Sequence, residues 1–138
     1  MYGEYQHSVD SKGRIFVPAK LREELGDRFY VIPGVERCLL VYTMEKWAPV
    51  QEKIDALPLA KRGQLRHLMA NIAECTPDKQ GRILLPTRLR EYAELRQDIT
   101  FLGQSDHAEI WDTAAYERSV DDQLSPEYLR AAMEALEI

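Results

Sequence analysis

The chain has 138 residues, of which 45% are hydrophobic and 30% are charged, a composition typical of a globular protein with one compact domain or two small halves. It contains no apolar run as long as a membrane span and no apolar signal-peptide core at the N-terminus, so we expect a cytoplasmic protein with reduced structural thiols at Cys38 and Cys75. The net charge of −5 is unevenly distributed: it is −1 over residues 1–60, +4 over 61–97 and −8 over 98–138. Because local fields decide binding, an anionic partner is not excluded, but the acidic tail must face away from it.

The N-terminal part of the sequence predicts a turn between two short strands, followed by a short helix. Gly13 can adopt the positive φ that a tight turn requires, and Pro18 suits the end of a strand and the first turn of a helix. Gly26 is a typical residue to end that helix. The expected elements, in chain order, are a strand over 5–9, a turn over 10–14, a strand over 15–17 and a helix over 18–25.

A hairpin and a helix are expected next. Strands over 29–32 and 38–42 flank a turn at Pro33 and Gly34, and Thr43 is a good N-cap for the helix that follows. The spacing of Trp47, Val50 and Ile54 places them on one face of this helix. Residues 55–58 break the pattern and form the expected boundary between the two halves.

A second helix is expected over residues 59–73. Its apolar stripe comprises Leu65, Leu68, Met69 and Ile72, and its other face carries Lys61, Arg62 and Arg66. We interpret that basic face as a solvated surface of a packing helix rather than as a direct phosphate contact.

The second half repeats the first. Strands over 98–102 and 108–111 flank a turn over 103–106, and Asp112 or Thr113 caps the next helix. Trp111 and Tyr116 occupy the places of Tyr42 and Trp47, and we expect all four aromatic side chains to lie in the core. Ser125 and Pro126 begin a C-terminal amphipathic helix that packs on the body or on a neighbouring subunit; its apolar residues are Leu129, Met133 and Leu136.

One motif occurs twice at a fixed internal spacing. The residues 10–18, DSKGRIFVP, correspond to residues 78–86, DKQGRILLP, and the match continues as Leu-Arg-Glu at 21–23 and 89–91. In each copy an aspartate lies four residues before an arginine, and a glycine directly precedes that arginine. Such a duplicated unit predicts two copies of the same local structure.

The two motif arginines, Arg14 and Arg82, allow two interpretations. Each could only form an ion pair with its aspartate, Asp10 or Asp78, and thereby hold the turn. Alternatively, each could be presented on a protruding loop to bind an anion, with the aspartate fixing its orientation. The repetition, with a basic companion in each copy, leaves both interpretations open on pattern alone.

Patterns for catalysis or metal binding are missing from the sequence. There is no phosphate-binding glycine loop, no nucleophile elbow and no C-x-x-C pair, and the three histidines have no ligand spacing. His7 close to Ser8 and Asp10, or Cys38, could serve a hydrolase, but the signal is weak. The sequence therefore predicts no enzyme activity, no metal and no cofactor.

The motifs resemble those of the MraZ family. The likeness rests on the N-terminal segment 2–14, on both D-x-x-x-R motifs, on Leu-Arg-Glu-Tyr at 89–92 and on Glu-Ile-Trp-Asp at 109–112, and it spans nearly the whole chain. The family belongs with the AbrB-like and SpoVT-like swapped-hairpin barrels. The resemblance therefore implies an α+β, mostly β fold in which tandem AbrB-like repeats form an interleaved swapped-hairpin β-barrel with flanking short helices.

This resemblance also implies a domain organisation. The first AbrB-like repeat with its helix would span residues 1–57 and the second repeat residues 74–121. The connecting helix would span 58–73 and the C-terminal helix 122–138. In the second repeat, Pro77 lacks the N–H that a sheet requires, so we expect the strand before it to end early.

The function implied by the resemblance is sequence-specific, double-stranded DNA binding. Members regulate the bacterial division and cell-wall gene cluster, form homo-oligomeric rings and bind short direct repeats in their own promoter region, in the cytoplasm on the nucleoid. An antitoxin-like protein-interaction module of the same fold, binding a partner through the acidic C-terminal helix, is the alternative.

Carried over by position, the family's motif residues predict the DNA-contacting side chains. The motif arginines fall on Arg14 and Arg82, and arginine can bind guanine in the major groove or phosphate. Lys12, with Lys79 and Arg22 as weaker candidates, would add sequence-independent attraction. Since Gln80 replaces Lys12 in the second copy, we expect the first motif to be the stronger contact.

Overall fold

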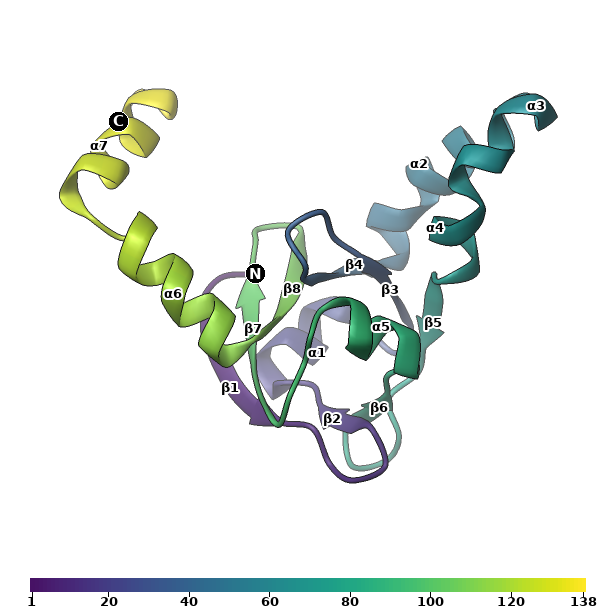
Figure 1. Cartoon of the computed structure of the whole chain (residues 1–138), viewed down its shortest axis with the longest axis horizontal. Coiled ribbons are helices and arrows are strands. Elements are labelled where there is room, and N and C mark those ends of the chain that lie inside the picture. Colours follow the sequence, from purple (N-terminus) through teal and green to yellow (C-terminus); the bar gives the residue numbers. More distant parts are fainter.

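The computed structural model describes residues 1–138 as an α+β protein with one large antiparallel sheet and several short helices (Figure 1). Its strands are β1 (Glu4–Ser8), β2 (Arg14–Phe16), β3 (Phe29–Pro33), β4 (Leu39–Thr43), β5 (Ala73–Cys75), β6 (Arg82–Leu84), β7 (Asp98–Gly103) and β8 (His107–Asp112). Its helices are α1 (Ala19–Leu25), α2 (Met44–Asp55), α3 (Leu59–Arg62), the 3₁₀ turn η1 (Gly63–Leu65), α4 (Arg66–Ala70), α5 (Thr87–Tyr92), α6 (Thr113–Gln123) and α7 (Pro126–Ala135).

Cap residues set the helix boundaries as the sequence predicts. Gly26, with φ of +81°, ends α1, and the Thr43 hydroxyl accepts a hydrogen bond of 3.0 Å from the Lys46 N–H at the start of α2. The choice between Asp112 and Thr113 as the cap of α6 is resolved in favour of Asp112, whose carboxylate accepts from the Ala115 N–H. The cap residues therefore fix the boundaries of these helices.

Strands from the two halves of the chain are interleaved within the sheet. The order of the six strands is β1-β7-β8-β4-β3-β5, so β1 of the first half pairs with β7 of the second, and β5 of the second pairs with β3 of the first. At the centre, β4 pairs antiparallel with β8, with Leu40 opposite Glu109. Because Leu40 and Glu109 are equivalent positions of the repeat, the halves are related by an approximate two-fold axis through this pair.

The sheet is open, which differs from the closed β-barrel implied by the family resemblance. Its edges are β1 and β5, while β2 and β6 pair only with each other in a separate two-stranded sheet, here called the motif ribbon. The hydrogen-bond ladder does not close because the motif ribbon is only three residues long and joins the β1 segment through one bridge, between Val9 and Ile15. The motif ribbon is instead joined to the large sheet by side-chain packing.

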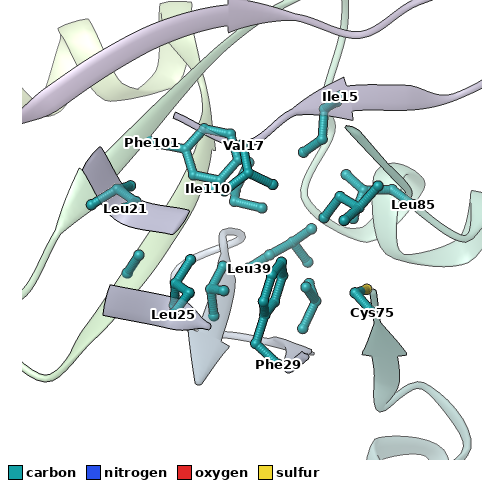
Figure 2. Packing of buried hydrophobic residues seen from close by; sticks show 14 of the residues in the cluster. Ile15, Val17, Leu21, Leu25, Phe29, Leu39, Cys75, Leu85, Phe101 and Ile110 are labelled. Carbon is teal, nitrogen blue, oxygen red and sulfur yellow. The ribbon is translucent and has the colours of Figure 1, made fainter. Parts of the chain in front are cut away.

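The hydrophobic core lies between the large sheet, the motif ribbon and helices α1 and α5 (Figure 2). Ile15 and Ile83 face each other across the motif ribbon and are 1% and 3% exposed, so the ribbon's inner face belongs to the core. Phe29 and Phe101, both fully buried, fill the space on the sheet side. Apolar residues from both halves thus share one core, which neither half could form alone.

Two helical arms leave the sheet on the side away from the motif ribbon (Figure 1). One arm contains α6 and α7, and the other contains α2 with α3, η1 and α4. The predicted continuous helix over residues 59–73 is wrong, because it is interrupted at Gly63, a poor helix former. None of the helices combines the length and the apolar character that a membrane crossing requires.

The prediction that four aromatic side chains lie in the core is correct only for Trp47. Trp47 is 5% exposed and stacks on Tyr30 with ring centroids 4.9 Å apart, whereas Tyr42, Trp111 and Tyr116 are half-buried. These three lie where the helical arms join the sheet. On α7, the apolar stripe of Leu129, Met133 and Leu136 is exposed and does not pack on the body.

The pairing between halves predicts that a fragment of residues 1–57 is unfolded on its own. In the fragment, β1 would lose β7, β4 would lose β8, and the inner face of β2 would lose Ile83. Circular dichroism and amide exchange should show no protected strands in the fragment. Mixing it with residues 58–138 should restore the protection. A fragment 1–57 that folds cooperatively alone would contradict this arrangement.

Candidate nucleic-acid interface

The first motif forms a tight loop organised by the Asp10 carboxylate. One carboxylate oxygen accepts hydrogen bonds of 2.9 Å from the backbone N–H groups of Lys12 and Arg14, and the other accepts one of 2.7 Å from the Arg14 Nε. The Asp10 N–H also donates a hydrogen bond of 2.9 Å to the Arg14 carbonyl. A single side chain therefore fixes both the path of the loop and the direction of the arginine.

The second motif repeats this geometry. The Asp78 carboxylate accepts 2.9 Å bonds from the N–H groups of Gln80 and Arg82 and from the Arg82 Nε. The strand before it differs, because β5 ends at Cys75 whereas β1 continues to Ser8, as the position of Pro77 predicts. At the equivalent position the Val9 N–H donates to the Gln97 carbonyl, a bond that proline cannot make.

Each loop is held against the other half of the chain. The Gly13 carbonyl accepts from the Leu85 N–H at 3.1 Å, and the Gly81 carbonyl accepts from the Val17 N–H at 2.9 Å. Both glycines have φ of +81°, a conformation that other residues adopt only at a cost. The two loops therefore lie at opposite ends of the motif ribbon and are linked through it.

The register of the motif ribbon places both arginines on its outer face. Arg14 lies opposite Leu84 and Arg82 lies opposite Phe16, while the central pair of isoleucines faces the core. Side chains alternate between faces along a strand, so Arg14, Phe16, Arg82 and Leu84 all point outward. The arginines are diagonal neighbours, with Cα atoms about 7–8 Å apart in this type of pairing.

Both guanidinium groups remain available to a partner. The Arg14 side chain is 32% exposed and that of Arg82 is 21% exposed. Each uses only its Nε for the aspartate, and neither terminal nitrogen has a hydrogen-bond partner within the protein. The structure thus shows the ion pair of the first interpretation, and it leaves the terminal nitrogens without a partner, as the second interpretation requires.

The remaining predicted basic residues fall into two groups. Lys12 and Lys79 are exposed on the two loops and form no ion pair. Arg22 is half-buried on α1 and lies against the second loop: a Cβ built at Gly81 would come within 2.3 Å of its Nη1. Its Nε is buried without a partner, which distinguishes Arg22 from the freely exposed lysines.

Arg90, which sequence reasoning did not single out, mirrors Arg22. It lies on α5 against the first loop, where a Cβ at Gly13 would come within 2.8 Å of its guanidinium carbon, and its Nε donates to the Leu85 carbonyl. The signal that could have revealed it was the repeat itself, because Arg22 and Arg90 occupy equivalent positions. Each of these arginines packs on the loop of the other half and helps to position it.

Hydrogen bonding keeps the loop carboxylates ionised. The pKa of Asp10 is lowered to about 2, chiefly by the backbone N–H of Arg14 and further by the Arg14 side chain. The pKa of Asp78 is lowered for the same reasons, with the backbone N–H of Arg82 as the main cause. The acid in each loop is therefore fully charged at neutral pH and holds its arginine firmly.

His7 and Cys38, which the sequence suggests for a hydrolase, lie in buried or half-buried surroundings. Burial raises the pKa of the Cys38 thiol to about 12 and that of Cys75 to about 11, so both stay protonated. His7 lies beside the rings of Phe16 and Phe101, and burial lowers its pKa. The geometry favours a packing role for these side chains.

Comparison with known proteins matches the chain over nearly its whole length to one family model. That model, described as "MraZ protein, putative antitoxin-like", matches residues 1–66 and 68–135. Among similar curated proteins, the transcriptional regulator MraZ of Acetivibrio thermocellus is 43% identical over 99% of both chains. The regulators of the same name from Caldicellulosiruptor saccharolyticus and Caldanaerobacter subterraneus are 43% and 45% identical. They cover 100% and 85% of this chain, and the matches span 99% and 84% of their own lengths.

We expect the Asp10 carboxyl to titrate at about pH 2 in the folded protein, against 3.8 in an ordinary aspartate. Because folding lowers this pKa, the stabilisation is complete above about pH 3.8 and is lost as the pH falls through about 2. In Arg14→Ala the pKa should rise only part of the way, since the backbone N–H groups still donate. Carboxyl NMR shifts measured against pH test this, and a wild-type midpoint near 3.8 would contradict it.

Proposed function

Because the chain belongs to the MraZ family, we propose that it is a sequence-specific, DNA-binding transcriptional regulator. We propose further that it binds short direct repeats of double-stranded DNA upstream of its own operon, in the division and cell-wall gene cluster. The observation that carries this proposal is the pair of half-exposed arginines, Arg14 and Arg82, on one outward face of the motif ribbon. Its relatives carry the name of transcriptional regulators, which supports the role.

The shape of the motif ribbon suits the major groove of DNA. That groove admits a two-stranded β-ribbon, and its guanine edges present two acceptors to which arginine donates in a bidentate manner. The terminal nitrogens of Arg14 and Arg82 are the donors left after each Nε has bound its aspartate. Since the aspartates hold both side chains in place before DNA arrives, little side-chain entropy is lost on binding.

Contacts with the phosphate backbone of DNA would supply the rest of the binding affinity. Lys12 and Lys79 are exposed on the loops that flank the arginines and can approach phosphates, a contribution that weakens with salt. Arg22 lies beneath the second loop, so in this proposal its charge acts at short range through that loop. The greater exposure of Arg14 than of Arg82 supports the first motif as the stronger contact.

The distribution of charge over the fold agrees with the binding of DNA at the motif ribbon. The segment 98–138, with net charge −8, includes α6 and α7, which leave the body on the side away from the motif ribbon (Figure 1). A duplex bound to the ribbon would therefore be separated from most of the acidic side chains. We place the protein in the cytoplasm, on the nucleoid, because its operator lies there.

We also propose that the chain forms a homo-oligomeric ring through α7. The exposed apolar stripe of α7 needs a cover, and α7 itself is acidic. A groove of about 480 Å³ between α4, α5 and the β3–β4 turn offers apolar and basic side chains, and it is lined by Pro33, Gly34, Val35, His67, Leu68, Asn71, Arg88, Leu89 and Tyr92. The two surfaces are different parts of the chain, so in this proposal the contact is head-to-tail and repeats around a ring.

A ring of this kind suits direct repeats. Head-to-tail neighbours present their ribbons in the same orientation, and linked contacts gain from a high effective concentration. In this proposal residues 1–57 and 74–121 are the two AbrB-like repeats of a swapped-hairpin arrangement, residues 58–73 connect them and residues 122–138 join the subunits. The pairing of β1 with β7 and of β5 with β3 supports that division.

An antitoxin-like protein-interaction module remains the second candidate. The exposed apolar stripe of α7 supports it, because such a stripe also suits a foreign protein chain, and the matching family model is described as antitoxin-like. Co-purification of a stoichiometric basic protein that is released by changes in α7 would favour this candidate over DNA binding.

Replacing Arg14 by alanine should abolish most specific DNA binding and leave the fold intact. The loss of one bidentate guanine contact should weaken DNA binding about tenfold to a hundredfold, and Arg82→Ala should weaken it by a smaller factor. Gel-shift titration on the duplex upstream of the gene, at two salt concentrations, measures both effects. Circular dichroism and light scattering check the fold and the oligomer.

The matched control is Arg118→Ala, which removes an exposed arginine from α6 on the opposite side of the molecule. It should bind DNA as the wild type does. Full-strength binding by Arg14→Ala would refute the assignment. Unfolding of that variant would instead identify Arg14 as a structural residue.

Charges placed in the α7 stripe should dissociate the ring. Leu129→Glu with Met133→Glu puts carboxylates into the proposed apolar contact, and light scattering should then give the mass of a monomer. Ala131→Glu, on the opposite side of the helix by its spacing, should leave the oligomer intact. A double variant that keeps the wild-type mass would exclude α7 from the interface.

A further inference from the structure

Two large apolar side chains lie on the outer face of the motif ribbon, each opposite one of the arginines. Phe16 is 46% exposed and Leu84 is 63% exposed, although the residues between them and the arginines, Ile15 and Ile83, are buried. These two positions are equivalent in the repeat, so the feature occurs in both halves of the chain. Packing does not require it, because the isoleucines already supply the ribbon's contribution to the core.

The register pairs each apolar side chain with an arginine of the other motif. Phe16 lies directly opposite Arg82, and Leu84 lies directly opposite Arg14. The outer face therefore carries two cation–apolar pairs, each with Cβ atoms about 5 Å apart. The Phe16 ring lies beside His7, with ring centroids 6.5 Å apart and the ring planes tilted by 36°, which limits where the phenyl group can turn.

The surroundings of this apolar face indicate which partner covers it. Four cationic side chains surround it: Arg14 and Arg82 on the ribbon, and Lys12 and Lys79 on the loops. The two acids nearby, Asp10 and Asp78, are already bound to the arginines. A partner must therefore be anionic overall and present small apolar groups beside hydrogen-bond acceptors. The major groove of DNA has these properties, because thymine carries a methyl group at C5 and guanine carries two acceptors.

We propose that Phe16 and Leu84 determine sequence specificity by contacting thymine methyl groups next to the guanines bound by Arg82 and Arg14. This inference rests on the proposed DNA-binding function and deepens it. It predicts that thymine lies beside guanine in the sequence that the protein prefers. The arginine and the apolar residue of one cross-strand pair would read adjacent bases together.

Uracil provides the test, because it keeps the hydrogen-bonding groups of thymine and lacks only the methyl. The wild type should bind the duplex upstream of its gene about fourfold more tightly than the same duplex with uracil in place of thymine, for each methyl buried. The variant carrying Phe16→Ala and Leu84→Ala should bind the thymine and uracil duplexes equally. Tyr2→Ala, which removes another exposed aromatic residue, should discriminate as the wild type does.

Each result tests either the methyl contact or the proposed function. Equal binding of the two duplexes by the wild type would overturn the methyl contact. Discrimination that survives in the Phe16→Ala, Leu84→Ala variant would also overturn it, because the uracil effect would then arise from DNA shape. Failure of the wild type to prefer the upstream duplex over an unrelated duplex of equal length would overturn the proposed function itself. Thermal unfolding of the variants checks that both exposed substitutions leave the fold unchanged.

Discussion

Strand pairing between the two halves of the chain is the constraint on which the rest of the structure depends. Because β2 pairs with β6, the two motifs are brought to one ribbon, and their arginines to one face of it. The same interleaving builds a core that neither half could close alone. A separate folding of each half would have left the two loops independent and the arginines without a common surface.

Within each loop, the aspartate fixes the direction of the arginine, but its negative charge weakens the positive field of the loop. A carboxylate beside a polyanion site repels phosphate, yet Asp10 accepts two backbone N–H bonds and the Arg14 Nε, which spread its charge over three donors. The lowered pKa of Asp10 records how strongly these donors stabilise the anion. Under the proposed function, the fixed direction of the guanidinium would favour recognition of a base edge over loose attraction to phosphate.

Sequence patterns were sufficient to predict most elements and the two Asp–Arg pairs, because turns, caps and ion pairs four residues apart are local. Nonlocal features escaped prediction. The open sheet depends on how few residues β2 and β6 share, and the half-buried state of Trp111 and Tyr116 depends on where the helical arms leave the sheet. The outward direction of Phe16 and Leu84 follows only from the partner strand, since Ile15, Phe16 and Val17 are all apolar and their alternation is invisible in the sequence.

The approximate two-fold axis joins halves that are not identical: Lys12 corresponds to Gln80, and Phe16 corresponds to Leu84. In a dimer of identical chains, every substitution changes both symmetry mates at once. Because both halves lie in one chain, that coupling is absent, and a single mutation here alters one motif and leaves the other unchanged. Under the proposed function, the two motifs could therefore come to prefer different bases while the shared core stays constant.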